Sequence, residues 1–411
     1  MFDLVDILKK DSVSGDDSPK NEITSVLFYQ TNKCQVLVKE AYRFEGLVTP
    51  AIVQNNDENI KEHVRNESIE IVIVELNESR NISQDAERIS HLLPNDASVI
   101  VIGSEDAIST IRNLKGMGFY YLFWPITKHE LIEFVLSVHE NRNRNKGLGK
   151  KRKAKQISVI GSKGGVGTTL ICTEIAHLLS DDKKSSCVLV DNDYQGGNVD
   201  IMLGMEKFEK RQIRPGAFAT TLDNTSAQGM LVKYNKLLSV LSLTSTSLSN
   251  SEIKEYTKTV VEHIAADSNF IIDDLSSIAR QNFNKEEVVE LSDSVILVLE
   301  PTVSSLRDAA RIKQQLEDEN QESNMRMFIV LNYCVPTSSA TVTLQEVEKF
   351  LRTDVDVVIP FVKRLDSYIL ERKRISKIGG KTEKALRKLV ALIVGEDEKR
   401  VFHCFFVGNN G

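Results

Sequence analysis

The chain of 411 residues has few cysteines, no long apolar run and only a small net charge. Its five cysteines are scattered and form no Cys-x-x-Cys pair, so we expect the reduced thiols of a cytosolic protein rather than disulfides or zinc ligands. No apolar run approaches the roughly eighteen residues that a transmembrane helix needs. The N-terminus lacks the basic start and apolar core that predict a signal peptide. A net charge of −6 argues against nucleic-acid binding by the whole surface.

The length predicts two or three domains, and the composition is that of an ordinary globular protein. Residues 141–155 read NRNRNKGLGKKRKAK, which is more than half basic and contains no acid. We interpret this stretch as a solvated linker; attraction to anionic lipid or nucleic acid is the alternative. The predicted segments are a flexible N-terminal segment (1–23), a first domain (24–140), the basic linker (141–155), a second domain (156–397) and a C-terminal tail (398–411).

Both long segments alternate strand-like and helix-like runs. In the first domain we expect strands at 26–29, 69–74, 98–102 and 120–123, and a last helix at 128–140. In the second we expect strands at 157–160, 188–190, 237–240, 270–272, 294–299, 327–331 and 357–359, and a closing helix at 382–394. The alternation predicts an α/β protein with two doubly wound domains, each a parallel sheet with helices on both faces.

The most informative segment is Ile157-Ser-Val-Ile-Gly-Ser-Lys-Gly-Gly-Val-Gly-Thr-Thr169. A short apolar strand leads into a glycine-rich turn, and a helix follows from about Thr168. Glycines let successive backbone N–H groups point into one concavity, and the helix N-terminus adds partial positive charge, so the segment predicts a phosphate site. Thr169 stands where the loop hydroxyl would bind Mg²⁺. The candidate nucleotide-binding residues of the loop are Gly164, Gly165, Val166, Gly167, Thr168 and Thr169.

The loop lacks the lysine that the standard pattern places just before Thr169, and has Thr168 there. It carries an early lysine instead, Lys163. This loop resembles the deviant Walker A loop of the ParA/MinD-like ATPases, Lys-Gly-Gly-x-Gly-Lys-[Ser/Thr]. The resemblance implies that Lys163 reaches across a dimer interface to the partner's nucleotide. Losing one preorganised group of this kind typically costs roughly 10²–10³ in rate, so we expect ATP binding with slow or absent hydrolysis. A degenerate site that binds nothing is the alternative.

Acidic residues follow two further strands. Asp191 and Asp193 end one strand, and Asp273 and Asp274 end another, where carboxylates beside a phosphate loop can hold Mg²⁺ or orient water. Asp193 is similar to the residue with which the family positions the attacking water. The residues alone do not decide whether Asp273 or Asp274 binds the metal. The register of the family motif favours Asp274.

The resemblance continues to about residue 395. The stretch Leu297-Val-Leu-Glu-Pro-Thr-Val-Ser-Ser-Leu-Arg307 is similar to the corresponding segment of TadZ/CpaE proteins. Asn332 matches the family asparagine that contacts adenine, and its amide can donate and accept together. Pro360 and Phe361 match the piece that walls the base. The implied cofactors are ATP and Mg²⁺.

The order of elements in residues 24–140 resembles a response-regulator receiver domain. A working receiver needs an acidic pair, a phosphorylatable Asp, a hydroxyl and a Lys before Pro. Here Phe28-Tyr-Gln-Thr31 supplies no acidic pair, Glu75 stands at the acceptor position, and Trp124 precedes Pro125. We therefore expect an atypical receiver that serves as an interaction platform. A Rossmann-like nucleotide domain is disfavoured because no Gly-x-Gly-x-x-Gly follows the first strand.

An atypical receiver followed by a deviant-Walker ATPase resembles the architecture of TadZ/CpaE pilus-assembly proteins. The resemblance implies a cytoplasmic, polar scaffold that recruits the tight-adherence (Tad/Flp) pilus and secretion machinery at the membrane. Implied partners are a second copy of the chain in an ATP-sandwich homodimer and other Tad components, with indirect membrane association and no nucleic acid. The alternatives are a ParA-type DNA-partition ATPase and a MinD-like membrane-cycling ATPase. The latter needs an amphipathic membrane helix, for which residues 384–394 are the candidate, although core packing explains their pattern equally well.

Overall fold

The computed structural model describes residues 23–66, 69–95, 97–144, 153–216, 222–277, 284–320 and 325–396. The predicted C-terminal tail, almost all of the N-terminal segment and most of the basic linker lie outside these residues. Contacts divide the chain into two compact units: residues 1–80 with 97–149, and residues 81–96 with 150–411. Within the described ranges, no helix combines the length and the apolar character needed to span a membrane.

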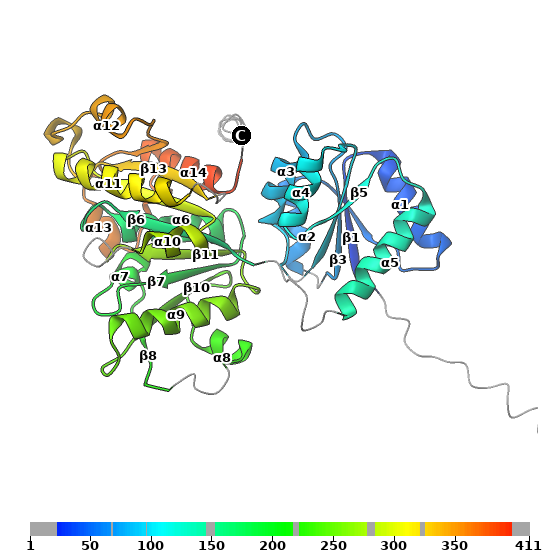
Figure 1. The fold of residues 1–411 in the computed structure, drawn as a ribbon, viewed down its shortest axis with the longest axis horizontal. Coiled ribbons are helices and arrows are strands. Elements are labelled where there is room, and N and C mark those ends of the chain that lie inside the picture. The colour runs from blue at the N-terminus through cyan, green and yellow to red at the C-terminus, as the bar shows by residue number, and fades with distance from the viewer. Residues whose placement is uncertain are drawn as a thin grey trace, which may run out of the picture. The chain divides into compact units, whose positions relative to one another are not determined.

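The first unit contains a five-stranded parallel sheet in the order β2-β1-β3-β4-β5 (Figure 1). This is the strand order of flavodoxin-like doubly wound folds. Its strands are β1 Ser25–Tyr29, β2 Ala51–Gln54, β3 Ile71–Glu75, β4 Ser98–Gly103 and β5 Tyr120–Phe123. Its helices are α1 Asn32–Phe44, α2 Asp57–Asn66, α4 Ile108–Gly116 and α5 Lys128–Arg144; α3 Ile82–Ser90 lies in the segment grouped with the second unit.

Helices α1 and α5 cover one face of this sheet because each presents a buried apolar stripe to it. Val38 and Tyr42 of α1 and Leu131 and Val135 of α5 pack in one cluster with alternate residues of the central strands, such as Ile73. Side chains that alternate along a strand point to opposite faces, so the fully buried strand β3 also has apolar residues for its other face.

The described part of the second unit contains nine strands, and all pair in parallel except β9 with β10. The order is β14-β13-β12-β6-β11-β7-β10-β8, with β9 beside β10. The strands are β6 Lys155–Gly161, β7 Cys187–Asp191, β8 Arg211–Gln212, β9 Val232–Lys233, β10 Leu238–Thr244, β11 Phe270–Leu275, β12 Ser294–Leu299, β13 Arg326–Asn332 and β14 Val357–Ile359.

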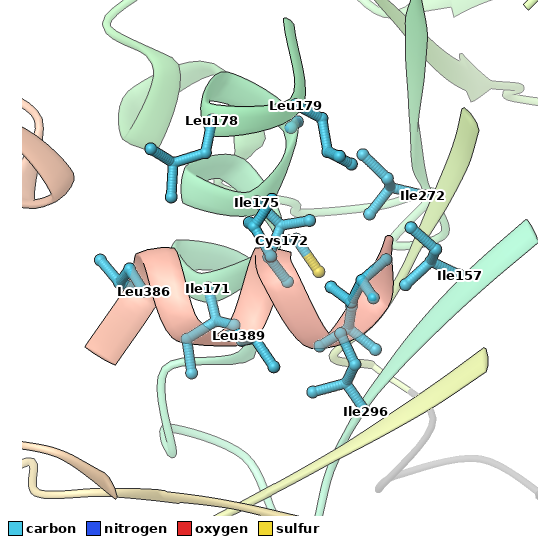
Figure 2. Packing of buried hydrophobic residues seen from close by; sticks show 14 of the residues in the cluster. Ile157, Ile171, Cys172, Ile175, Leu178, Leu179, Ile272, Ile296, Leu386 and Leu389 are labelled. Atoms are coloured by element: carbon cyan, nitrogen blue, oxygen red, sulfur yellow. The ribbon is translucent and has the colours of Figure 1, made fainter. Parts of the chain in front are cut away.

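Helices lie on both faces of this sheet. They are α6 Thr168–Asp181, α7 Val199–Leu203, α8 Asn224–Gly229, α9 Asn250–Ile264, α10 Lys285–Leu291, α11 Val303–Glu319, α12 Leu344–Leu351, α13 Leu365–Leu370 and α14 Gly380–Ile393. On one face, α6 and α14 pack with Ile157, Ile272 and Ile296 (Figure 2). Alternate residues of β12, such as Leu297, pack with α11 and α12 in a second cluster. The predicted α/β class with parallel sheets is confirmed.

Helix α14 contains residues 384–393 of the stretch for which the sequence allowed two roles, binding to a membrane or packing in the core. Leu386, Leu389, Val390 and Ile393 are almost fully buried, and Figure 2 shows Leu386 and Leu389 facing Ile171 and Ile175 of α6. The apolar side of this helix is therefore used by the core.

Candidate nucleotide-binding site

The glycine-rich loop joins β6 to α6 at the carboxyl edge of the sheet, where doubly wound folds place ligands. Gly165 and Gly167 have φ of +85° and +90°, in the left-handed region that favours glycine. A Cβ on Gly167 would also lie 2.5 Å from Nδ2 of Asn332. The sequence therefore needs glycine at 167 for two reasons, backbone conformation and close approach.

Asn332, at the end of β13, helps to hold this loop. Its Nδ2 donates to the carbonyl of Val166 at 2.9 Å, and the Sγ of Cys334 lies 3.7 Å from the carbonyl of Gly165. Val166 and Asn332 are both buried. The side chain that the resemblance assigns to adenine is thus placed at the loop, and one of its amide hydrogens is used there.

Thr168 and Thr169 open α6 and face different groups. Thr168 is 4% exposed, and a Cβ on Gly161 would lie 2.4 Å from its Oγ1, so its hydroxyl is packed against the end of β6. The side chain of Thr169 lies beside the carboxylate of Asp274, which is 1% exposed. The two residues predicted to bind Mg²⁺ are therefore in contact.

The neighbouring aspartate lies on the other face of β11, because successive strand residues alternate. Asp273 accepts a hydrogen bond from Nε2 of Gln156 at 2.7 Å. Burial raises the pKa of both Asp273 and Asp274 to about 6. Only Asp274 faces the loop hydroxyl of Thr169. The structure therefore distinguishes the two aspartates, which the sequence alone left as alternative metal ligands.

A lysine just before β8, which the sequence analysis missed, contacts the acidic residues at the end of β7. Asp191 is buried and accepts hydrogen bonds from Nζ of Lys210 at 2.9 Å, Oγ of Ser242 at 2.8 Å and N of Asp193 at 3.0 Å. Lys210 also contacts the carbonyl oxygen of Asp193. Asp193 closes a turn by accepting from the N–H groups of Gln195 and Gly196. Lys210 belongs to no motif, so the sequence carries no signal for it.

Lys163 forms an ion pair within its own chain, 2.6 Å from Oε1 of Glu300. Glu300 follows β12, whose Val298 pairs with Gly161 of β6, so the strand pairing brings this carboxylate beside the loop. Sequence reasoning found Glu300 only as part of a motif and assigned it no role.

Pro360 and Phe361 follow β14 at the same edge of the sheet. Ile359 is in register with Asn332, so Pro360 and Phe361 begin just past the strand that lies beside this asparagine. Phe361 is 38% exposed. The candidate residues for the phosphates, the metal and the base thus meet at one edge of one sheet.

This arrangement suits Mg²⁺, which proteins commonly bind through one or two side-chain oxygens plus phosphate and water. Thr169 and Asp274 offer a hydroxyl and a carboxylate in contact. Across the residues that the structure describes, no group of three or more His, Cys, Asp or Glu side chains forms a metal site.

In the first unit, Glu75 is the residue that the sequence analysis set against the phosphorylatable Asp of a receiver domain. Its carboxylate is fully buried and accepts hydrogen bonds from N of Gln30 at 2.6 Å, N and Oγ1 of Thr31 at 2.8 and 2.6 Å, and Nδ2 of Asn77 at 2.9 Å. The carboxylate thus joins the end of β3 to the start of α1.

Residues 157–377 match the model of the CobQ/CobB/MinD/ParA nucleotide binding domain. The chain is 24% identical over 253 residues to the septum site-determining protein MinD of Helicobacter pylori, covering 60% of this chain and 92% of that protein. It is 25% identical over 256 residues to an uncharacterized ATP-binding protein of Methanocaldococcus jannaschii, with the same coverage of 60% and 92%. A solved ParA family ATPase from Chlorobium tepidum has a TM-score of 0.48 at 19% identity, covering 58% of this chain and 98% of that one.

Proposed function

This chain belongs to the CobQ/CobB/MinD/ParA nucleotide binding domain family, and we propose that it is an ATP-gated scaffold that self-associates through its nucleotide site. The observation that carries the proposal is the meeting of three features at one edge of the sheet. These are a loop with left-handed glycines at 165 and 167, the contact of Thr169 with Asp274, and Lys163 near the start of the same loop.

Each part of the site has a role in this proposal. Backbone N–H groups of residues 164–168 hold the phosphates, and the N-terminus of α6 adds its partial charge. Thr169 and Asp274 would hold Mg²⁺, which would supply positive charge to stabilise the phosphates. Lys163 contacts the nucleotide of a second copy. Asp193 orients water. Asn332, Pro360 and Phe361 lie around the base.

We propose that hydrolysis is slow or absent. Thr168 replaces the lysine of the standard loop, and its short side chain is packed against Gly161. The loss of one group that follows charge into the transition state costs roughly 2.7–4 kcal/mol. A protein that binds ATP without rapid turnover keeps its self-associated form as long as ATP is present.

For the cellular role we propose a TadZ/CpaE-like scaffold of the tight-adherence pilus and secretion machinery, peripheral to the cytoplasmic membrane and polar. The proposal includes an atypical receiver as the first domain. The strand order 2-1-3-4-5 supports that fold, and Glu75 supports the loss of phosphoryl chemistry, because its carboxylate is already bound by four donors. An interaction platform is what such a domain retains.

The test combines self-association with turnover. Sedimentation velocity of the wild type with Mg-ATP is expected to show a dimer, with little phosphate released over the same period. Lys163→Ala is expected to lose the ATP-dependent dimer. The matched control is Lys236→Ala, because Lys236 is exposed just before β10, at the opposite edge of the sheet. A wild type that binds no nucleotide, or a dimer indifferent to both ATP and Lys163, contradicts the proposal.

A further inference from the structure

Lys163 is the one lysine within loop residues 161–169, so whatever holds it governs the positive charge of the loop. Its ammonium lies 2.6 Å from Oε1 of Glu300. The other lysine described above, Lys210, is likewise held by an acid, 2.9 Å from Oδ2 of Asp191. Both cations are therefore neutralised by carboxylates of their own chain.

The carboxylate of Glu300 is fixed more firmly than the lysine. The backbone N–H of Glu300 donates to Oγ of Ser305 at 2.9 Å, and that buried serine shares a 2.7 Å hydrogen bond with Ser162. Oε1 of Glu300 also accepts from Oγ1 of Thr302 at 3.1 Å. The side chain is 15% exposed, whereas that of Lys163 is 35% exposed and has a flexible four-carbon stem. When the pair separates, the lysine is the partner that moves.

The thiol of Cys334 lies beside the pair and is hydrogen-bonded to Glu300, but it brings no positive charge. Burial, and then the nearby Glu300, raise the pKa of the Cys334 thiol to about 11, so it is neutral at physiological pH. Separation therefore leaves Glu300 as a part-buried carboxylate without its cation, which is unfavourable.

We propose that Glu300 is an internal competitor for Lys163, a positioning residue that holds the lysine back until the phosphates of a bound nucleotide displace it. The inference rests on the proposed function, in which Lys163 reaches the nucleotide of a second copy. That reach requires the lysine to leave Glu300. The ion pair then raises the ATP concentration at which the chain self-associates.

The test is Glu300→Gln, which keeps the shape of the side chain and an acceptor oxygen for Thr302 but removes the charge. The ATP concentration for half-maximal dimer, measured by sedimentation, is expected to fall about two- to fivefold, the range of partly exposed ion pairs. Glu300→Ala is expected to act in the same direction. Glu255→Gln on the exposed side of α9 is the matched control for a unit change in charge.

A double variant assigns the effect to the pair. Lys163→Ala is expected to abolish the ATP-dependent dimer, and adding Glu300→Gln to it is expected not to restore the dimer, because Glu300 then has no lysine to compete for. An unchanged ATP requirement in the Glu300 variants overturns the inference, and a raised one shows that Glu300 aims Lys163 instead of restraining it. If the wild type forms no ATP-dependent dimer, the proposed function itself is contradicted. If the wild type dimerises and the Glu300 variants need the same ATP concentration, only the inference about Glu300 is overturned.

Discussion

Asp273 and Asp274 are adjacent in the sequence and have opposite surroundings. Asp273 is bound by Gln156, whereas Asp274 lies beside Thr169. The sequence predicts that an acid ends this buried strand, but it leaves open which face α6 covers. That choice depends on the packing of β11 against α6, so only the structure separates the two residues.

The buried carboxylates give the first prediction at the scale of the residue. Burial raises the pKa of Asp274 to about 6 from its usual value of 3.8. The folded protein therefore binds more protons than the unfolded chain between these values, and stability falls as the pH rises through that window. Asp274→Asn removes the buried charge, so its free energy of unfolding is expected to exceed that of the wild type at pH 7.5, by up to about 3 kcal/mol. The gain disappears near pH 4.

The function of the site is expected to change in the opposite direction. Asp274→Asn should lose Mg²⁺-dependent nucleotide binding, measured with a fluorescent ATP analogue in Mg²⁺ or EDTA. Asp273→Asn is the matched variant, because the pKa of Asp273 is also raised to about 6 by burial but its side chain faces away from Thr169. It should gain stability in urea at pH 7.5 and keep nucleotide binding. Loss of binding in Asp273→Asn alone would reverse the assignment.

At the scale of the element, apolar runs predicted the buried strands and one half-buried edge strand, β5. The strands predicted at 120–123, 294–299 and 357–359 coincide with β5, β12 and β14. Strands β2, β8 and β9 were missed. β2 is a half-buried edge strand, and β8 and β9 have two residues each, so none of them carries a long apolar run.

Contacts between distant elements could not be predicted from the sequence either. The pairing of Lys163 with Glu300 exists because β12 lies beside β6, and the hold of Asn332 on Val166 exists because β13 lies beside β12. A motif marks the residues of one segment, whereas the order of strands in the sheet decides which segments meet.

Glu75 gives the prediction at this scale, because one side chain joins β3 to α1. Glu75→Gln replaces an acceptor oxygen with an NH₂ group that faces N–H and O–H donors. Hydrogen bonds to charged groups contribute about 1.5–3 kcal/mol, and we expect a loss of stability of that size in the first unit. Urea unfolding followed by Trp124, the single tryptophan, measures it there. Glu78→Gln, an exposed change three residues away, should leave the midpoint in place; equal midpoints for both variants would show that the buried carboxylate is dispensable.

At the scale of the whole molecule, the alternation of elements predicted two α/β domains, and the described residues form one parallel sheet and one sheet that is parallel except at β9. The strand order of each sheet was not predicted from the residues themselves. Several crossovers fit the same alternation, and packing of helices on both faces selects among them. The alternation of elements therefore predicted the class of fold, whereas the placement of the site at one sheet edge came from the structure.

Charge is distributed unevenly along the chain, which bears on the rival DNA-partition function. The chain has a net charge of −6, yet residues 141–155 contain eight basic residues and no acid. Lys155, the last of them, already pairs with Asp293 at 3.0 Å. A short cationic segment binds DNA phosphates through counterion release, and such binding falls steeply with salt.

We therefore expect a fluorescent DNA duplex to bind weakly at about 25 mM salt and not measurably at about 150 mM, where the screening length is near 8 Å. Fluorescence anisotropy measures this. Changing Lys150, Lys151, Arg152 and Lys153 together to Gln should abolish the low-salt binding, because these residues carry the densest positive charge of the chain. Binding that requires ATP, persists at the higher salt and ignores these four changes would instead place a DNA-binding surface on the nucleotide-binding unit. The protein would then act as a partition ATPase, and self-association with ATP would serve to build that surface.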